Sequence, residues 1–132
     1  MASVTKEIQV GVSADEAWDA IRDIGALHTR LVPGFVTGTQ LEDGGAARVV
    51  TFINGVVVRE PIVALDEERR RLVWTAEGGR TTHYNASAQV VVDGGGVKIV
   101  WTADFLPHEA RGAIDAAMTA GAAAMQKALS AP

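Results

Sequence analysis

Five turn-forming segments, spaced at about the length of a β-strand, constrain this sequence more than any other feature. They are DGG at 43–45, NG at 54–55, DEE at 66–68, GGR at 78–80 and DGGG at 93–96. Short clusters of glycine, asparagine and aspartate between apolar runs are typical of hairpin turns. The sequence therefore predicts six antiparallel strands joined as a meander, the last of which ends at Pro107.

The segments on either side of this meander predict one more strand and three helices. Residues 4–12 alternate between apolar and polar side chains, as in a strand with one buried face. The stretch SADEAWDAIRDIG follows, with Ser13 and Glu16 spaced as a capping box and Gly25 as its expected end. ALHTRLVPG then predicts a second short helix, and 108–129 predicts a long one.

The long C-terminal helix has to cover the sheet. Its apolar stripe runs through Ile114, Met118, Gly121, Met125 and Leu129, and such a stripe is buried against another layer. We therefore expect an α+β fold, in which a curved seven-stranded antiparallel sheet wraps around this helix. Alanines flank the stripe, so either bulky sheet residues fill the space between helix and sheet or a pocket is left there.

Composition narrows the functions that the chain can have. The 132 residues suit a single domain, 1–132, with its own core. There is no cysteine, which excludes disulfides and thiolate metal sites, and the histidines show no metal-ligand spacing. The net charge is −4 without a basic cluster, so nucleic acid is not expected as a partner. No signal peptide or membrane span is recognisable, and a cytoplasmic location is expected.

A glutamate lies in the middle of an otherwise apolar strand face. In VVVREPIVALD, Glu60 alternates with Val58 and Ile62. Loop lengths of three, three and four residues would place it in one row across four strands with Trp74, Tyr84 and Phe105. This row, with Met118 from the helix, is the predicted lining of a ligand pocket. Glu60 and Tyr84 would be its polar groups.

Arg48 has two alternative orientations. A two-residue NG hairpin turns Val49 and Thr51 inward and leaves Arg48 on the surface. A three-residue loop turns Arg48 inward, where it would pair with Glu60.

These elements, in this order, resemble the helix-grip proteins of the START/Bet v 1-like superfamily. The resemblance covers essentially the whole chain and rests on VSADEAWDAIRDIGALHTRLVPG, REPIVALDEERRRLVW and THYNASAQVVV followed by VWTADFLP. Abscisic acid receptors of this superfamily carry a cavity glutamate and tyrosine at positions similar to Glu60 and Tyr84, and an arginine similar to Arg80. The short NG link lacks those receptors' longer gating loop, so their hormone and phosphatase partner are not carried over.

Three functions follow as hypotheses. The first is a carrier or binding protein for a small hydrophobic or aromatic molecule, held by Glu60, Tyr84, Trp74, Phe105, Met118 and Arg48. The second is an enzyme similar to the polyketide cyclases, with Glu60 transferring a proton. The third is a filled core with a partner-binding surface, with a homodimer as one form. No cofactor is expected in any of them.

Overall fold

The computed structural model describes residues 2–130 and contains one seven-stranded antiparallel sheet. Its strands are β1 Ala2–Val10, β2 Val36–Glu42, β3 Ala47–Phe52, β4 Val57–Asp66, β5 Arg71–Thr75, β6 His83–Asp93 and β7 Gly96–Leu106. The spatial order is β1-β7-β6-β5-β4-β3-β2, so the meander closes with β7 beside β1. This confirms the expected fold class.

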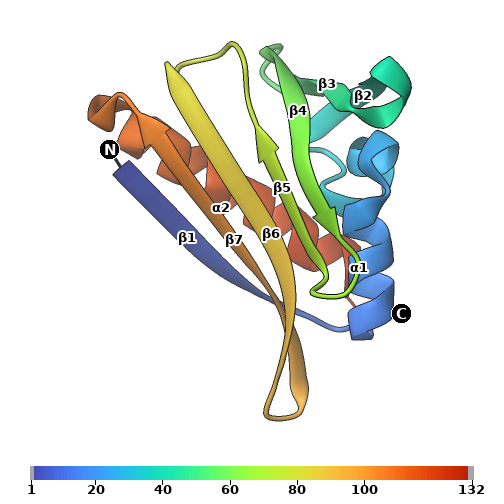
Figure 1. Ribbon diagram of the computed structural model, residues 1–132. Helices are drawn as coiled ribbons and strands as arrows, with labels where there is room; N and C mark the ends of the chain where they lie inside the picture. Colours follow the sequence, from blue (N-terminus) through green and yellow to red (C-terminus); the bar gives the residue numbers. More distant parts are fainter. Residues whose placement is uncertain (1, 131–132) are drawn as a thin grey trace.

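The long helix α2, Arg111–Ala128, lies across one face of the sheet (Figure 1). A short 3-10 turn, η4 His108–Ala110, precedes it. The predicted stripe is the side that faces the sheet, because Met118, Gly121, Met125 and Leu129 are buried. No helix among residues 2–130 is both long and apolar enough to cross a membrane.

The connection between β1 and β2 carries short helices, as expected. Helix α1, Ala14–Arg22, starts at Ser13, whose Oγ accepts a hydrogen bond from the Glu16 backbone N–H at 3.1 Å. It ends at Arg22, three residues before the expected Gly25. Two single turns follow, η1 Ile24–Ala26 and η2 Leu27–Leu31, and another, η3 Asp43–Gly45, separates β2 from β3.

The β4–β5 hairpin corrects the predicted register. A three-residue loop would have placed Glu60 opposite Trp74. Instead four residues separate Asp66 from its partner Arg71, and a bulge then shifts the ladder so that Trp74 pairs with Ile62. Ile62 and Glu60 are two residues apart, so Glu60 still points to the same face as Trp74.

The β5–β6 hairpin is displaced in the same direction. The expected turn at 78–80 put Tyr84 opposite Trp74, but Ala86 holds that place. Tyr84 lies opposite Ala76, whose N–H donates to the Tyr84 carbonyl at 3.3 Å. Because the displacement is two residues, Tyr84 keeps the predicted face.

Candidate functional site: a cavity between helix and sheet

A cavity of about 490 Å³ lies between the inner face of the sheet and α2. Its walls are mostly aliphatic and aromatic side chains, with a few polar groups. Among those that line it are Trp74, Trp101 and Met118 deep inside, Phe35 and Phe52 nearer the surface, and Arg48, Glu60, Tyr84, Arg80 and Thr81 as polar members. The space that the sequence left undecided is therefore open and not filled by bulky sheet residues.

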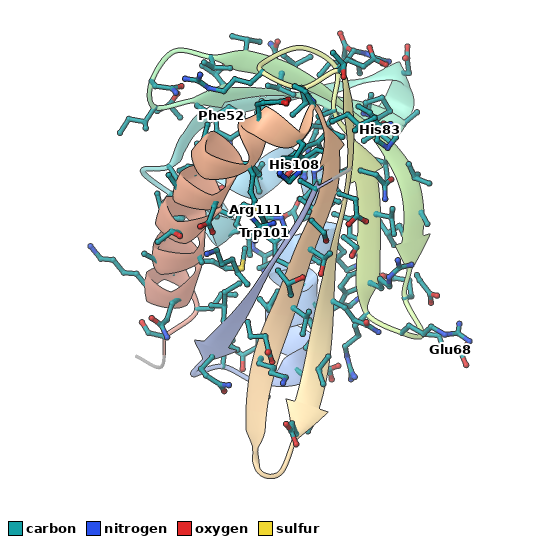
Figure 2. All side chains as sticks on the ribbon, turned by 90° about the vertical axis from the view of Figure 1, so that its left-hand side faces the viewer. Phe52, Glu68, His83, Trp101, His108 and Arg111 are labelled. Atoms are coloured by element: carbon teal, nitrogen blue, oxygen red, sulfur yellow. The ribbon has the colours of Figure 1, made fainter. Side chains whose placement is uncertain are left out.

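The small residues of α2 explain why the space is open at one end and closed at the other. Near its beginning the helix offers Ala113, Ile114 and Ala117 to the cavity, and two of these three side chains are single methyl groups. Farther along, Gly121 packs directly on Trp101, and a Cβ atom at Gly121 would come within 2.9 Å of Trp101 Cη2. Trp101 lies between α2 and the sheet in Figure 2. The helix is thus close to the sheet at Gly121 and leaves room before it.

Arg48 and Glu60 form a buried ion pair in the cavity wall. Arg48 Nε donates to Glu60 Oε1 at 2.8 Å, and the two residues are 2% and 6% exposed. They face each other directly across β3 and β4. The Phe52 N–H bonds to the Val56 carbonyl and closes a three-residue loop, so of the two orientations considered for Arg48 the inward one is found.

The Arg48 guanidinium also contacts the ring of Trp74. The Arg48 Cζ atom lies 5.4 Å from the centre of the Trp74 ring, within the range of a cation–π contact. Arg48 Nη1 also donates weakly to the Ile24 carbonyl at 3.4 Å. A guanidinium fixed by a carboxylate and a ring is pre-organised, because little side-chain freedom is left to lose on ligand binding.

Burial sets the acid–base character of Glu60. Removal from water raises the pKa of the Glu60 carboxyl, and the charge and hydrogen bond of Arg48 oppose this rise. Glu60 is thus less acidic than an ordinary glutamate although an arginine is in contact with it. A carboxylate of this kind can accept a hydrogen bond from a ligand, or can exchange a proton with it.

Tyr84 is the second polar group of the inner face. Its ring stacks on Phe105 with 6.5 Å between centres and 21° between planes. Burial, and the nearby charge of Glu60, raise the pKa of the Tyr84 phenol, so it is a hydrogen-bond donor at neutral pH. Phe105 is fully buried and is not among the cavity-lining residues. Its predicted place on the wall is corrected: Tyr84 covers Phe105 from the cavity.

The row of side chains across the sheet is therefore not the predicted one. Glu60 lies opposite Ala76, because the adjacent Arg59 and Glu77 are bridged. Ala76 is in turn opposite Tyr84, which pairs with Phe105. The small side chain of Ala76 stands where Trp74 was expected, between the carboxylate and the phenol, and it lines the cavity.

The cavity opens toward the β3–β4 loop and the beginning of α2. Ile53, in that loop, is 68% exposed and still lines the cavity. Phe35 and Phe52 contact each other edge to face with 5.4 Å between ring centres. Phe52 is seen beside the first turns of α2 in Figure 2. We call this region, residues 53–56, 79–81 and the side of α2 carrying Ala113 and Ala117, the cavity mouth.

The histidines lie elsewhere. His83 is exposed, on the outer face of the sheet (Figure 2), and His108 is exposed before α2. His28 hydrogen-bonds Thr39 through Nδ1 at 3.1 Å. Within residues 2–130 no three histidine, aspartate or glutamate side chains are arranged as metal ligands.

Ala76 and the residues of the mouth other than Arg80 were not identified from the sequence, and Arg80 was noted only through the resemblance to the abscisic acid receptors. Nothing in the local pattern distinguishes Ala76 from the other alanines, since its role comes from its strand partners. Phe52 was accessible to prediction, because the three-residue loop that turns Arg48 inward also turns Phe52 inward.

Comparison with known proteins places the chain in a family. Residues 1–131 match the model of the family described as polyketide cyclase / dehydrase and lipid transport. The chain belongs to this family and, with it, to the START/Bet v 1-like superfamily that the sequence resembled. No curated protein matches the chain.

Solved structures show the same fold at low identity. The protein XoxI from Bacillus cereus is 20% identical, with a TM-score of 0.85 over 98% of this chain and 96% of that one. Ginseng major latex-like protein 151 from Panax ginseng is 15% identical, with a TM-score of 0.79 over 99% and 98%. Norcoclaurine synthase from Thalictrum flavum, a point mutant bound to a transition-state analogue, is 24% identical, with a TM-score of 0.69 over 97% and 93%.

Proposed function

We propose that this protein binds a small, mostly hydrophobic molecule in the cavity between α2 and the sheet, as a carrier or binding protein. The observation that carries the proposal is the cavity itself, which has about 490 Å³ and opens at the mouth. Small-molecule sites usually have about 300–1,000 Å³ and apolar walls with few polar groups. The family description, which includes lipid transport, supports the same class of ligand.

The polar side chains give such a ligand one preferred orientation. Arg48, Glu60 and Tyr84 come from neighbouring parts of β3, β4 and β6, whereas Met118 and the alanines of α2 form an apolar wall. Trp74 supplies a flat surface against which a ring can stack. A ligand with a hydrocarbon body and one polar end satisfies both sides of the cavity.

Thermal-shift screening against aromatic polyketides, sterols and fatty acids tests the proposal. A ligand selective for the folded state raises the melting temperature. In Ala117→Trp a large side chain stands at the mouth, and the shift should be lost or much reduced. Ala116→Trp is the matched control, because Ala116 is exposed and does not line the cavity. If no compound stabilises the protein, or if both variants respond alike, the cavity is not the binding site.

Catalysis is the second candidate, and the buried Glu60 with its raised pKa favours it. The chemistry would be proton transfer to or from the ligand, as in a cyclase. Glu60→Gln separates the two functions once a ligand is known. A carrier should keep most of its affinity, whereas an enzyme that uses Glu60 as acid or base should lose turnover about 100-fold or more. A homodimer stays a prediction, which sedimentation velocity would test.

A further inference from the structure

The polar row of the inner face contains one small residue between two large polar ones. Glu60 and Tyr84 lie on β4 and β6, and Ala76, the residue that follows β5, lies between them. Two strand steps separate the Cα atoms of Glu60 and Tyr84 by about 10 Å. Both side chains point to the cavity and line it, as does Ala76. The alanine methyl group leaves the space between the carboxylate and the phenol free for a ligand atom.

The hydrogen-bonding capacity of these two side chains is not used up within the protein. Glu60 Oε1 accepts from Arg48, and no described residue donates to the second carboxylate oxygen. Nor does the Tyr84 hydroxyl have a hydrogen-bond partner among residues 2–130. An ionised carboxylate only accepts, and a neutral phenol that faces it is best used as a donor. The space between them therefore suits a ligand group that donates on one side and accepts on the other.

Among common ligand groups, the hydroxyl has this property. An alcohol or phenol donates its proton to Glu60 while an oxygen lone pair accepts from Tyr84. An ether or ketone has no proton for Glu60, and a carboxylate brings a second negative charge next to it. The aromatic faces of Trp74, Phe35 and Phe52 along the same cavity favour a ring as the body of the ligand.

We propose that the cavity selects ring compounds that carry a hydroxyl group, and that this hydroxyl lies over Ala76 between Glu60 and Tyr84. The inference rests on the proposed binding function and makes Ala76 the residue that determines specificity. It adds a chemical class of ligand, phenols and ring alcohols, that neither the family description nor the fold assigns.

Four naphthalene derivatives test the inference by isothermal titration calorimetry at pH 7. They are 2-naphthol, 2-methoxynaphthalene, naphthalene and 2-naphthoate. Because a hydrogen bond to a charged group contributes about 1.5–3 kcal/mol, 2-naphthol should bind roughly 10- to 100-fold more tightly than 2-methoxynaphthalene. 2-Naphthoate should be weaker than 2-naphthol. Equal affinity of the naphthol and its methyl ether, or tighter binding of the naphthoate, would overturn the inference.

Two variants and one matched control locate the effect. In Ala76→Val the added methyl groups occupy the space of the hydroxyl, so the preference for 2-naphthol over naphthalene should fall to a few-fold or less. Thr75→Val is the matched control, because Thr75, the last residue of β5, directly precedes Ala76 and points to the other face. Tyr84→Phe keeps the ring on Phe105 and removes the donor, so it should reduce the same preference.

The outcomes distinguish this inference from the proposed function. If naphthalene binds but no variant alters the preference for the hydroxyl compound, the protein binds hydrophobic molecules, and the proposed position of the ligand hydroxyl over Ala76 is wrong. If none of the four compounds binds and the screen above also finds no ligand, the binding function itself fails. A melting temperature near that of the unmodified protein verifies that Ala76→Val is folded, and Tyr84→Phe gives the answer if it is not.

Discussion

Two arginine–glutamate pairs in this protein have the same atoms and the same distance in different surroundings. In the cavity wall, Arg48 Nε lies 2.8 Å from Glu60 Oε1, with side chains 3% and 8% exposed. On the surface, Arg22 Nε lies 2.8 Å from Glu67 Oε1, with side chains 42% and 56% exposed. The surface pair joins α1 to the β4–β5 turn, whose Glu68 is at the edge of the molecule in Figure 2.

The two glutamates respond in opposite ways. Burial raises the pKa of Glu60 in spite of its arginine. The hydrogen bond from Arg22, and a second from Trp18 Nε1, lower the pKa of Glu67. The two pairs have the same geometry, so their surroundings decide whether the pKa of the glutamate rises or falls. In the cavity, the cost of removing the carboxylate from water exceeds its attraction to the arginine, whereas at the surface this cost is small. The buried pair therefore suits ligand recognition better than it suits stability.

Breaking the buried pair should give the largest effect. In Arg48→Met the Glu60 carboxylate is left buried without a partner, and the free energy of unfolding should fall by about 3–5 kcal/mol. Urea unfolding measures this. Arg22→Met should cost distinctly less, because water solvates Glu67 when its partner is removed.

A double variant sharpens the same measurement. Arg48→Met/Glu60→Leu removes both charges and replaces them with apolar groups, so it should recover most of the loss. Equal losses in Arg48→Met and Arg22→Met would show that the burial of the cavity pair has no energetic consequence.

The pH dependence of stability should have opposite signs for the two glutamates. The raised pKa of Glu60 means that its contribution is fully present below the ordinary value of 4.5 and is lost as the pH rises through the folded-state pKa. The stability of the unmodified protein relative to Glu60→Gln should therefore decline above about pH 4.5, by up to about 1.4 kcal/mol per pH unit.

Glu67 should behave in the reverse sense. Its lowered pKa gives a contribution that is present above 4.5 and is lost as the pH falls through the folded-state pKa. Relative to Glu67→Gln, the unmodified protein should lose stability only on the acid side. Unfolding curves of the three proteins between about pH 3 and 7 compare the slopes, and slopes of the same sign would contradict the assignment of opposite pKa shifts.

Salt should give the smallest effect. A double-mutant cycle on Arg22 and Glu67 should yield a coupling that shrinks between about 0.05 M and 1 M salt, because the Debye length falls to about 3 Å at 1 M. The coupling measured by the same cycle on Arg48 and Glu60 should hardly change with salt, since both side chains are buried and dissolved ions do not reach them. A coupling of the cavity pair that is as salt-sensitive as the surface pair would mean that water and ions reach it freely.

The sequence predicted local features of this fold well. The Val92–Val97 pairing follows from its four-residue turn, and the Tyr84–Phe105 pairing is confirmed with it. The face of Glu60 was also correct although two registers were wrong. A displacement of two residues leaves a side chain on the same face, and the bulge before Ala64 compensates for the longer β4–β5 turn. The alternation of apolar and polar residues in a strand therefore predicts which face of the sheet a side chain points to more reliably than it predicts which residue lies opposite on the next strand.

The pairing of residues on neighbouring strands depends on the length of the turn between them, and the sequence indicates this length only weakly. DEE at 66–68 and GGR at 78–80 mark where the chain turns but not how many residues each turn takes. For that reason Trp74 was expected where Ala76 lies. Phe105 was expected on the cavity wall for another reason: its pairing with Tyr84 was predicted correctly, but not that the Tyr84 ring would stack on it and cover it. The choice between the two faces for Arg48 depended on a loop difference of one residue.

By itself, the sequence determined the order of elements, the helix stripe that faces the sheet and the presence of a carboxylate on an apolar face, because periodicity and turn residues act locally. Tertiary structure decided that Arg48 neutralises this carboxylate, that Ala76 separates it from Tyr84, and that α2 leaves a cavity of about 490 Å³ before it meets Trp101 at Gly121. These features arise from contacts between residues far apart in the chain, and packing alone sets them.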